Sequence, residues 1–131
     1  MPSPAVRDPL DAFDPDLVSS VAAETGGSAD ALRSLLRRHQ ESVRDLPGVD
    51  DLVYEWRRAL DDAVVVRTPE LFCCAVRPVV WSEFADALGL DGEERERLVA
   101  VHDRQARRIT RAEGASERAF GGRAAVVLTR E

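Results

Sequence analysis

Apolar residues recur at helical spacing along most of this chain. Asp14 followed by Pro15 is typical of a helix start, and Gly26 of a helix end. Ser28 and Asp91 are further capping residues, each followed by an apolar stripe. The pattern predicts helices over about residues 14–26, 28–44, 50–60, 78–88 and 92–111.

The apolar period shortens in three segments, which predicts strands. AVVVR (63–67) and LFCCAV (71–76) flank the turn TPE and read as a hairpin, and AAVVLT (124–129) reads as a closing strand after a loop over 112–123. These strands are apolar on both alternating faces, so we expect both faces of the sheet to be covered. The first three helices on one side and the last two on the other would cover them, and a dimer partner is the alternative.

These elements together predict an α+β fold, with about five helices packed on a small three-stranded antiparallel sheet. Residues 1–13, which contain three prolines, are expected to form a flexible tail, and residues 14–131 a single domain. Neither a long apolar run nor a secretion signal is visible, so we expect no membrane partner and a cytoplasmic protein with reduced thiols.

The composition is biased toward arginine and acidic residues, but this bias does not indicate a function. All 18 basic residues are arginine, and the formal net charge is -6. An acidic surface without lysine suits a salt-rich cytoplasm. Together with the segments VYEWR, WSEF and VHDRQ, this style resembles that of small uncharacterised proteins encoded by halophilic archaea, over roughly residues 15 to 110. A bacterium with a GC-rich genome explains the same composition, and the resemblance implies no activity.

Residues 21–36, VAAETGGSADALRSLL, resemble the helix-turn-helix of repressor-type transcription regulators. Gly27 departs from that motif, and Asp30 would repel phosphate at the front of a recognition helix. The alternative is a plain helical hairpin. The matching positions are Ala22, Gly26, Ser28, Leu32 and Leu36, and the resemblance implies DNA contacts from Ser28, Arg33 and Arg37.

Cys73 and Cys74 are adjacent in an apolar run and are the only cysteines. Neighbouring side chains on a strand point to opposite faces, so the two thiols are expected to diverge and to lie in the core. A β-bulge at this place would instead turn both to one side.

His39 and His102 each lie on a predicted apolar helix face. Two imidazoles and a thiol are zinc ligands, but no HxxxH or CxxC spacing supports a site, so we expect two packing histidines and no metal. Phosphate-binding glycine loops and a GxSxG serine motif are also absent from the sequence, so no cofactor is expected and an enzyme is not favoured.

The helix over 92–111 ends in a row of arginines that complements its dipole. The same row is a candidate patch for an anion or a partner: Arg104, Arg107, Arg108 and Arg111. The sequence therefore favours a small cytoplasmic binding protein, regulatory or adaptor, that acts through a protein partner or by self-association. A DNA-binding regulator is the alternative, and nucleic acid is not the favoured partner because a broad basic surface is missing.

Overall fold

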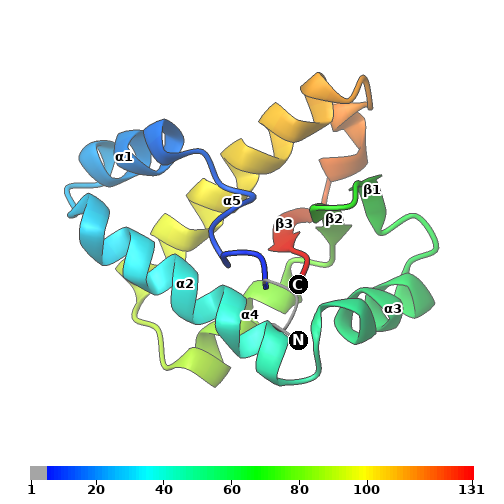
Figure 1. The fold of residues 1–131 in the computed structure, drawn as a ribbon, viewed down its shortest axis with the longest axis horizontal. Helices are drawn as coiled ribbons and strands as arrows, with labels where there is room; N and C mark the ends of the chain where they lie inside the picture. Colours follow the sequence, from blue (N-terminus) through cyan, green and yellow to red (C-terminus); the bar gives the residue numbers. More distant parts are fainter. Residues whose placement is uncertain (1–5) are drawn as a thin grey trace, which may run out of the picture.

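The computed structural model describes residues 6–131 and confirms the α+β fold. Five α-helices and a three-stranded antiparallel sheet lie within these residues (Figure 1). A 3-10 helix inside the expected loop over 112–123 was not predicted. The elements are α1 (Pro15–Glu24), α2 (Ala29–Asp45), α3 (Val49–Ala59), β1 (Val64–Arg67), β2 (Leu71–Val76), α4 (Val79–Leu88), α5 (Gly92–Ala112), η1 (Glu117–Phe120) and β3 (Ala124–Thr129).

The sheet has the order β1-β2-β3, with β2 in the middle. A tight hairpin joins the first two strands, closed by the Thr68 amide donating to the Leu71 carbonyl over 3.0 Å. β2 and β3 pair without interruption from Leu71 opposite Thr129 to Val76 opposite Ala124. The pairing of β1 with β2 contains one irregularity, between Val64 and Val66. The two outer strands therefore differ in regularity.

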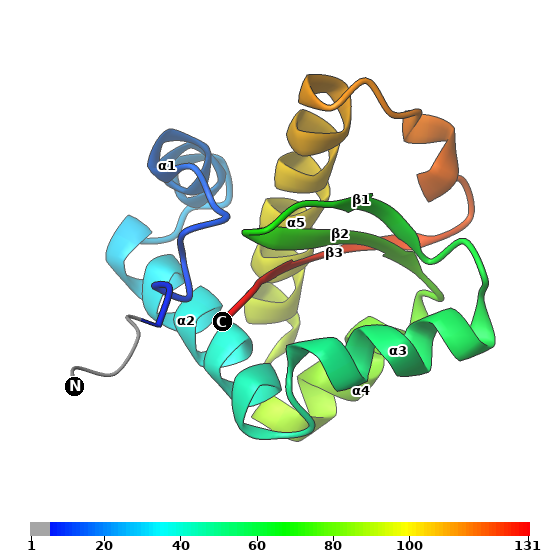
Figure 2. The same cartoon turned by 45° about the vertical axis from the view of Figure 1, so that its right-hand side comes forward.

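Both faces of the sheet are covered, but not by the expected groups of helices. α5 packs on the face that carries Cys73, whose thiol approaches the carbonyl of Ala106. α3 lies beside the opposite face, where Val53 and Phe72 line one groove. α1 packs on α2 and α5 rather than on the sheet (Figure 2). The expected division into three helices against two is wrong, because apolar periodicity marks which side of a helix is buried and not which surface it meets.

Residues 6–13 do not form the flexible tail that was expected. Phe13 and Ala12 are buried, and the Thr129 hydroxyl donates to the Pro9 carbonyl over 2.7 Å. The prolines prevent a helix here but do not prevent packing, and burial of Phe13, whose ring lies 5.1 Å from that of His102 in α5, stabilises the packed segment. The remainder of the expected tail, residues 1–5, lies outside the described residues.

Of two predicted N-cap residues, one caps its helix through its side chain and the other does not. Asp14 holds the N-cap position of α1, but its carboxylate caps no amide of the helix and instead accepts from Gln105 and Arg108 of α5. Asp91 caps α5 as expected, in a reciprocal pair with Glu94.

No helix among residues 6–131 is long and apolar enough to cross a membrane.

Candidate functional site

Side chains from three helices cover the outer edge of β3. The Trp81 indole donates to the Ala125 carbonyl over 3.2 Å, and the Val127 amide donates to Nδ1 of His102 over 2.9 Å. Gln40 donates to the Val127 carbonyl and accepts from the Thr129 amide, each over 2.9 Å. A buried edge strand needs partners for its backbone groups, and here tryptophan, histidine and glutamine supply them.

The two histidines are therefore structural parts of the core. Nδ1 of His102 accepts the hydrogen bond from Val127, and Nδ1 of His39 lies 3.3 Å from the side-chain nitrogen Nε2 of Gln40. Their rings pack edge to face at 5.0 Å, and Nε2 of each ring has no hydrogen-bond partner. Burial lowers the pKa of His39 to about 3, and burial together with His39 lowers the pKa of His102 well below its usual value. Both rings are consequently neutral at physiological pH.

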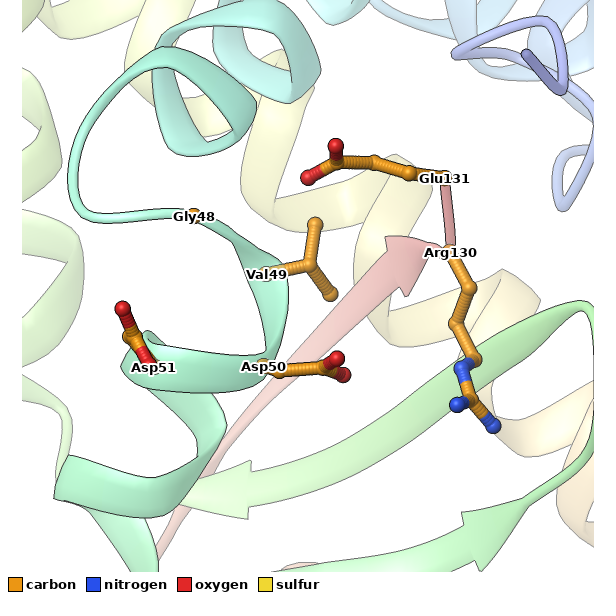
Figure 3. A pocket seen from close by; sticks show the side chains of 6 residues that line it. All are labelled: Gly48, Val49, Asp50, Asp51, Arg130 and Glu131. Atoms are coloured by element: carbon orange, nitrogen blue, oxygen red, sulfur yellow. The ribbon is translucent and has the colours of Figure 1, made fainter. Parts of the chain in front are cut away.

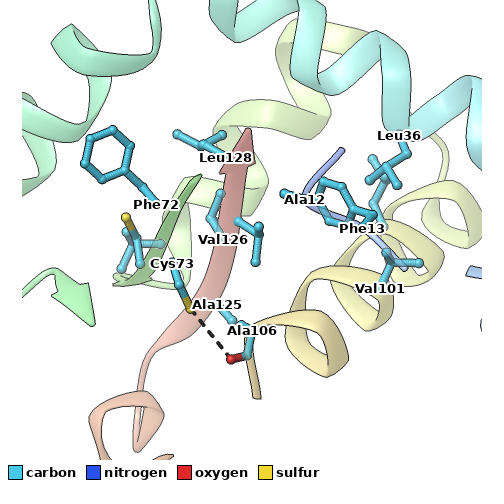
Figure 4. Close-up of a cluster of buried hydrophobic side chains, with 14 of the residues drawn as sticks. Ala12, Phe13, Leu36, Phe72, Cys73, Val101, Ala106, Ala125, Val126 and Leu128 are labelled. Atoms are coloured by element: carbon cyan, nitrogen blue, oxygen red, sulfur yellow. Dashed lines mark hydrogen bonds between the residues drawn. The ribbon is translucent and has the colours of Figure 1, made fainter. Parts of the chain in front are cut away.

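The cysteine pair follows the alternation of the strand. The Cys73 thiol lies 3.7 Å from the Ala106 carbonyl of α5 (Figure 4), whereas Cys74 is the next residue on the opposite face of β2. The bulge that would have brought them together lies in β1 and not in β2. Both residues are fully buried, and burial raises the pKa of Cys73 to about 11 and that of Cys74 further. The expectation of two divergent core cysteines is confirmed.

The two histidines and the two cysteines are thus all part of the packed core. Within residues 6–131, no group of three or more histidine, cysteine or acidic side chains is arranged to hold a metal ion. The thiols are protonated at neutral pH, and a protonated thiol is a poor nucleophile and a poor ligand. A functional surface has to be sought among the exposed side chains.

The segment over 21–36 forms two helices joined by a tight turn. Gly26 adopts a left-handed φ of 72°, which favours glycine, and the Ser28 hydroxyl accepts from the Ala31 amide. The expected DNA-contacting arginines are engaged within the protein: Arg33 pairs with Asp30 at 2.6 Å and Arg37 with Asp8 at 3.5 Å. Ser28 is likewise occupied as a cap.

The arginine row of α5 is also paired with acids. Arg108 lies 2.9 Å from Asp14, and Arg111 lies 2.9 Å from Glu117, whose pKa is lowered by that hydrogen bond. The row lines a groove against α1, but its positive charge is balanced locally, so it offers little net attraction to an anion. The remaining pairs are Arg104 with Glu24 and Arg107 with Asp103.

A different surface carries charged side chains of both signs that form no ion pairs within the described part of the chain, and we call it the α3–β1 groove. It is an open groove of about 440 Å³, lined by Asp50, Val53, Tyr54, Arg57, Asp61, Val64, Arg67, Phe72 and Arg130. The ion pairs among residues 6–131 include none that involves Arg57, Arg67, Asp50 or Asp61.

Aromatic groups accompany these charges in the α3–β1 groove. The guanidinium groups of Arg130 and Arg67 lie 4.8 and 5.8 Å from the ring centre of Phe72. Tyr54 is 62% exposed and lines the same groove. Tyrosine and arginine are enriched where proteins bind other proteins, because both combine apolar area with hydrogen bonding.

A second hollow continues the α3–β1 groove and shares Asp50 and Arg130 with it. It lies between the start of α3 and the residues after β3 (Figure 3). Gly48 has a φ of 102° there, a conformation that glycine favours, and it turns the chain into α3. The two hollows together form a continuous mixed-charge surface along one side of α3.

The α3–β1 groove was not predicted. Arg57 and Tyr54 lie in a charged stretch of a predicted helix, and a charged helix face is usually solvated surface, so the sequence gives no reason to single them out. The sequence does contain one signal for such a site: the predicted strand AVVVR follows two aspartates and ends in an arginine. Recognising it as a site required knowing that β1 is an edge strand, which is a property of the topology.

The comparison with known families places the chain in one of them. The model of the domain of unknown function DUF8048 matches residues 11–130, and the chain belongs to this family. No curated protein and no solved structure matches the chain significantly. The family match begins at residue 11, close to the buried Phe13 and within the segment that packs on the sheet.

Proposed function

We propose that this is a small non-enzymatic binding protein of the cytoplasm, a regulatory or adaptor protein that acts through a protein partner or through self-association. The observation that carries the proposal is the α3–β1 groove, where the arginines Arg57 and Arg67, which make no ion pair among residues 6–131, line one open hollow together with the exposed Tyr54. Arginine and tyrosine side chains gathered at one open groove are typical of a protein-binding surface.

The placement of the reactive side chains supports binding over catalysis. Both histidines and both cysteines are fully buried, and their shifted pKa values hold them neutral. General acid–base and nucleophilic catalysis need such groups within reach of a substrate. A binding role makes no such demand. The lysine-free composition further suggests a salt-rich cytoplasm, and we propose testing binding under high-salt and ordinary conditions.

Affinity capture with matched variants tests this proposal. The purified tagged chain is exposed to an extract of its own source, and retained proteins are identified by mass spectrometry. Arg57→Ala with Arg67→Ala is expected to abolish retention of the partner, whereas Arg58→Ala, on the same helix but lining another groove, preserves it. Equal retention by all three proteins contradicts the use of the α3–β1 groove.

A DNA-binding regulator is the second candidate, favoured by the capped turn between α1 and α2. In that case Arg33 and Arg37 exchange their carboxylate partners for phosphate groups. A gel-shift assay with genomic fragments at working salt decides it. Binding that is lost in Arg33→Ala with Arg37→Ala supports the regulator, and absence of any shift in the unaltered protein rules it out.

A further inference from the structure

We propose that the outer edge of β1 pairs with the β1 edge of a second copy of this chain, forming a two-fold homodimer whose sheet continues across both copies. The inference rests on the proposed function and names its partner. It uses three features of the described residues: unpaired backbone groups, a contrast between the two sheet edges, and a charge pattern that complements itself.

The backbone of β1 offers hydrogen bonds on its outer side. Ala63 and Thr68 both face β2, since the Ala63 carbonyl accepts from the Ala75 amide and the Thr68 amide donates to the Leu71 carbonyl. Backbone groups alternate in direction along a strand, so the neighbouring residues Val64 and Arg67 direct their amides and carbonyls away from β2. Ala63 and Thr68 are an odd number of residues apart, which the bulge between Val64 and Val66 explains.

The two edges of the sheet differ in whether their outward backbone groups have hydrogen-bond partners. Gln40, His102 and Trp81 satisfy the backbone groups of β3, whereas no strand lies beyond β1 among residues 6–131. Proteins usually protect an exposed edge with lysine, proline or a bulge, because an open edge pairs with other chains. β1 contains three valines, of which Val64 and Val65 are partly exposed, and its only protective features are the bulge and the charged Arg67 at its end.

The charges beside β1 identify a second copy as the occupant. Asp61 precedes the strand and Arg67 ends it, and neither makes an ion pair within residues 6–131. Antiparallel pairing about a two-fold axis brings Asp61 of one copy toward Arg67 of the partner subunit, and the reverse pair forms by symmetry. A purely acidic or purely basic peptide would leave one of these groups facing a like charge.

The α3–β1 groove adds area beside the paired strands. Tyr54 and Arg57 flank the same groove as Val64, so a second strand laid along β1 comes into reach of both. A short strand pair with such flanking contacts belongs to the smaller class of interfaces, which bury less than about 1,200 Å². The dimer is therefore expected to be weak and dependent on protein concentration.

Charge reversal tests the pairing without disturbing the core, because Asp61 and Arg67 are exposed. Sedimentation equilibrium over a concentration series, at about 0.15 M salt, measures the dimer dissociation constant. Asp61→Arg or Arg67→Glu alone is expected to weaken the dimer about tenfold or more, since each change acts at both symmetric contacts. The double variant restores complementarity, so its dissociation constant returns toward that of the unaltered protein. Arg58→Glu is the control of equal charge change and leaves it unchanged.

The outcomes separate this inference from the proposed function. A chain that stays monomeric up to about 1 mM, beyond the range of a weak interface, overturns the homodimer. A dimer that both single variants leave unaltered, or that the double variant fails to restore, overturns the β1 edge as its site. If the homodimer fails while affinity capture through the α3–β1 groove succeeds, the proposed function stands and this inference alone is wrong.

Discussion

At the scale of single residues, the informative positions are polar side chains inside an apolar core. Gln40 lies on the buried face of α2, and its amide serves both a carbonyl and an amide of β3. His102 serves the Val127 amide in the same way. A sequence shows that these residues interrupt an apolar stripe, but it does not show that they replace the missing neighbour of an edge strand.

Gln40→Leu is expected to lower the free energy of unfolding by about 2–4 kcal/mol, because it leaves two buried backbone groups without partners. Denaturant-induced unfolding followed by circular dichroism measures the change. Ser34→Ala, at an exposed position of α2, is the control and should stay within about 0.5 kcal/mol. A loss for Gln40→Leu no larger than this control would contradict the role assigned to Gln40.

Because both histidines are buried with lowered pKa values, we expect the free energy of unfolding to decrease as the pH falls. Folding holds the pKa of His39 at about 3, against about 6.5 in the unfolded chain, so below pH 6.5 the unfolded state binds more protons. The free energy of unfolding should therefore be unaffected by these groups above pH 6.5. It should decrease by about 1.4 kcal/mol per pH unit and per histidine below it.

Unfolding measured between pH 6.5 and 5, above the range in which carboxylates titrate, isolates this effect. The variant His39→Leu should lose roughly half of the slope, because His102 remains buried with a lowered pKa. An identical slope in both proteins would show that His39 takes up a proton in the folded state.

At the scale of elements, capping residues and apolar period located the helices and strands well. Asp91 marked the start of α5, and the prolines and glycines marked most of the other boundaries. The 3-10 helix over Glu117–Phe120 was missed because a single short turn has no apolar period of its own. The packing of residues 6–13 was missed because Phe13 is one apolar residue in a proline-containing segment, without a repeat to announce burial.

Asp91→Ala is expected to destabilise the protein by about 1 kcal/mol, since it removes the acceptor for the Glu94 amide and one half of the reciprocal cap. Thermal unfolding measures it. Asp86→Ala, at an exposed position inside α4, provides the matched comparison. Equal effects of the two substitutions would mean that the cap of α5 contributes nothing specific.

At the scale of the whole molecule, the core buries both thiols and both imidazoles, and the α3–β1 groove exposes charged side chains of both signs. A reagent for free thiols should therefore react with Cys73 and Cys74 only after unfolding, at a rate that rises with denaturant. Absorbance of the released reporter group measures this. Stoichiometric reaction within seconds in the native protein would place a thiol at the surface and reopen a chemical role for the pair.

The topology also makes the two sheet edges unequal, and that inequality could not be predicted from the sequence. The three strands were recognised from their composition, but the order β1-β2-β3 depends on which strands meet in space. Only that order makes β1 and β3 the edges, and only the packing of α2, α4 and α5 closes one of them. The central claim is that β3 is sealed for stability while β1 remains open for binding.

Residue-resolved amide hydrogen exchange tests this claim most directly. The amides of Val127 and Thr129 are bonded to His102 and Gln40, so they should exchange only through global unfolding. The outward amides of Val64 and Arg67 should exchange rapidly in dilute protein and slow markedly as the concentration rises. Equal protection of both edges in dilute protein would contradict the account. So would exchange rates at β1 that do not change with protein concentration.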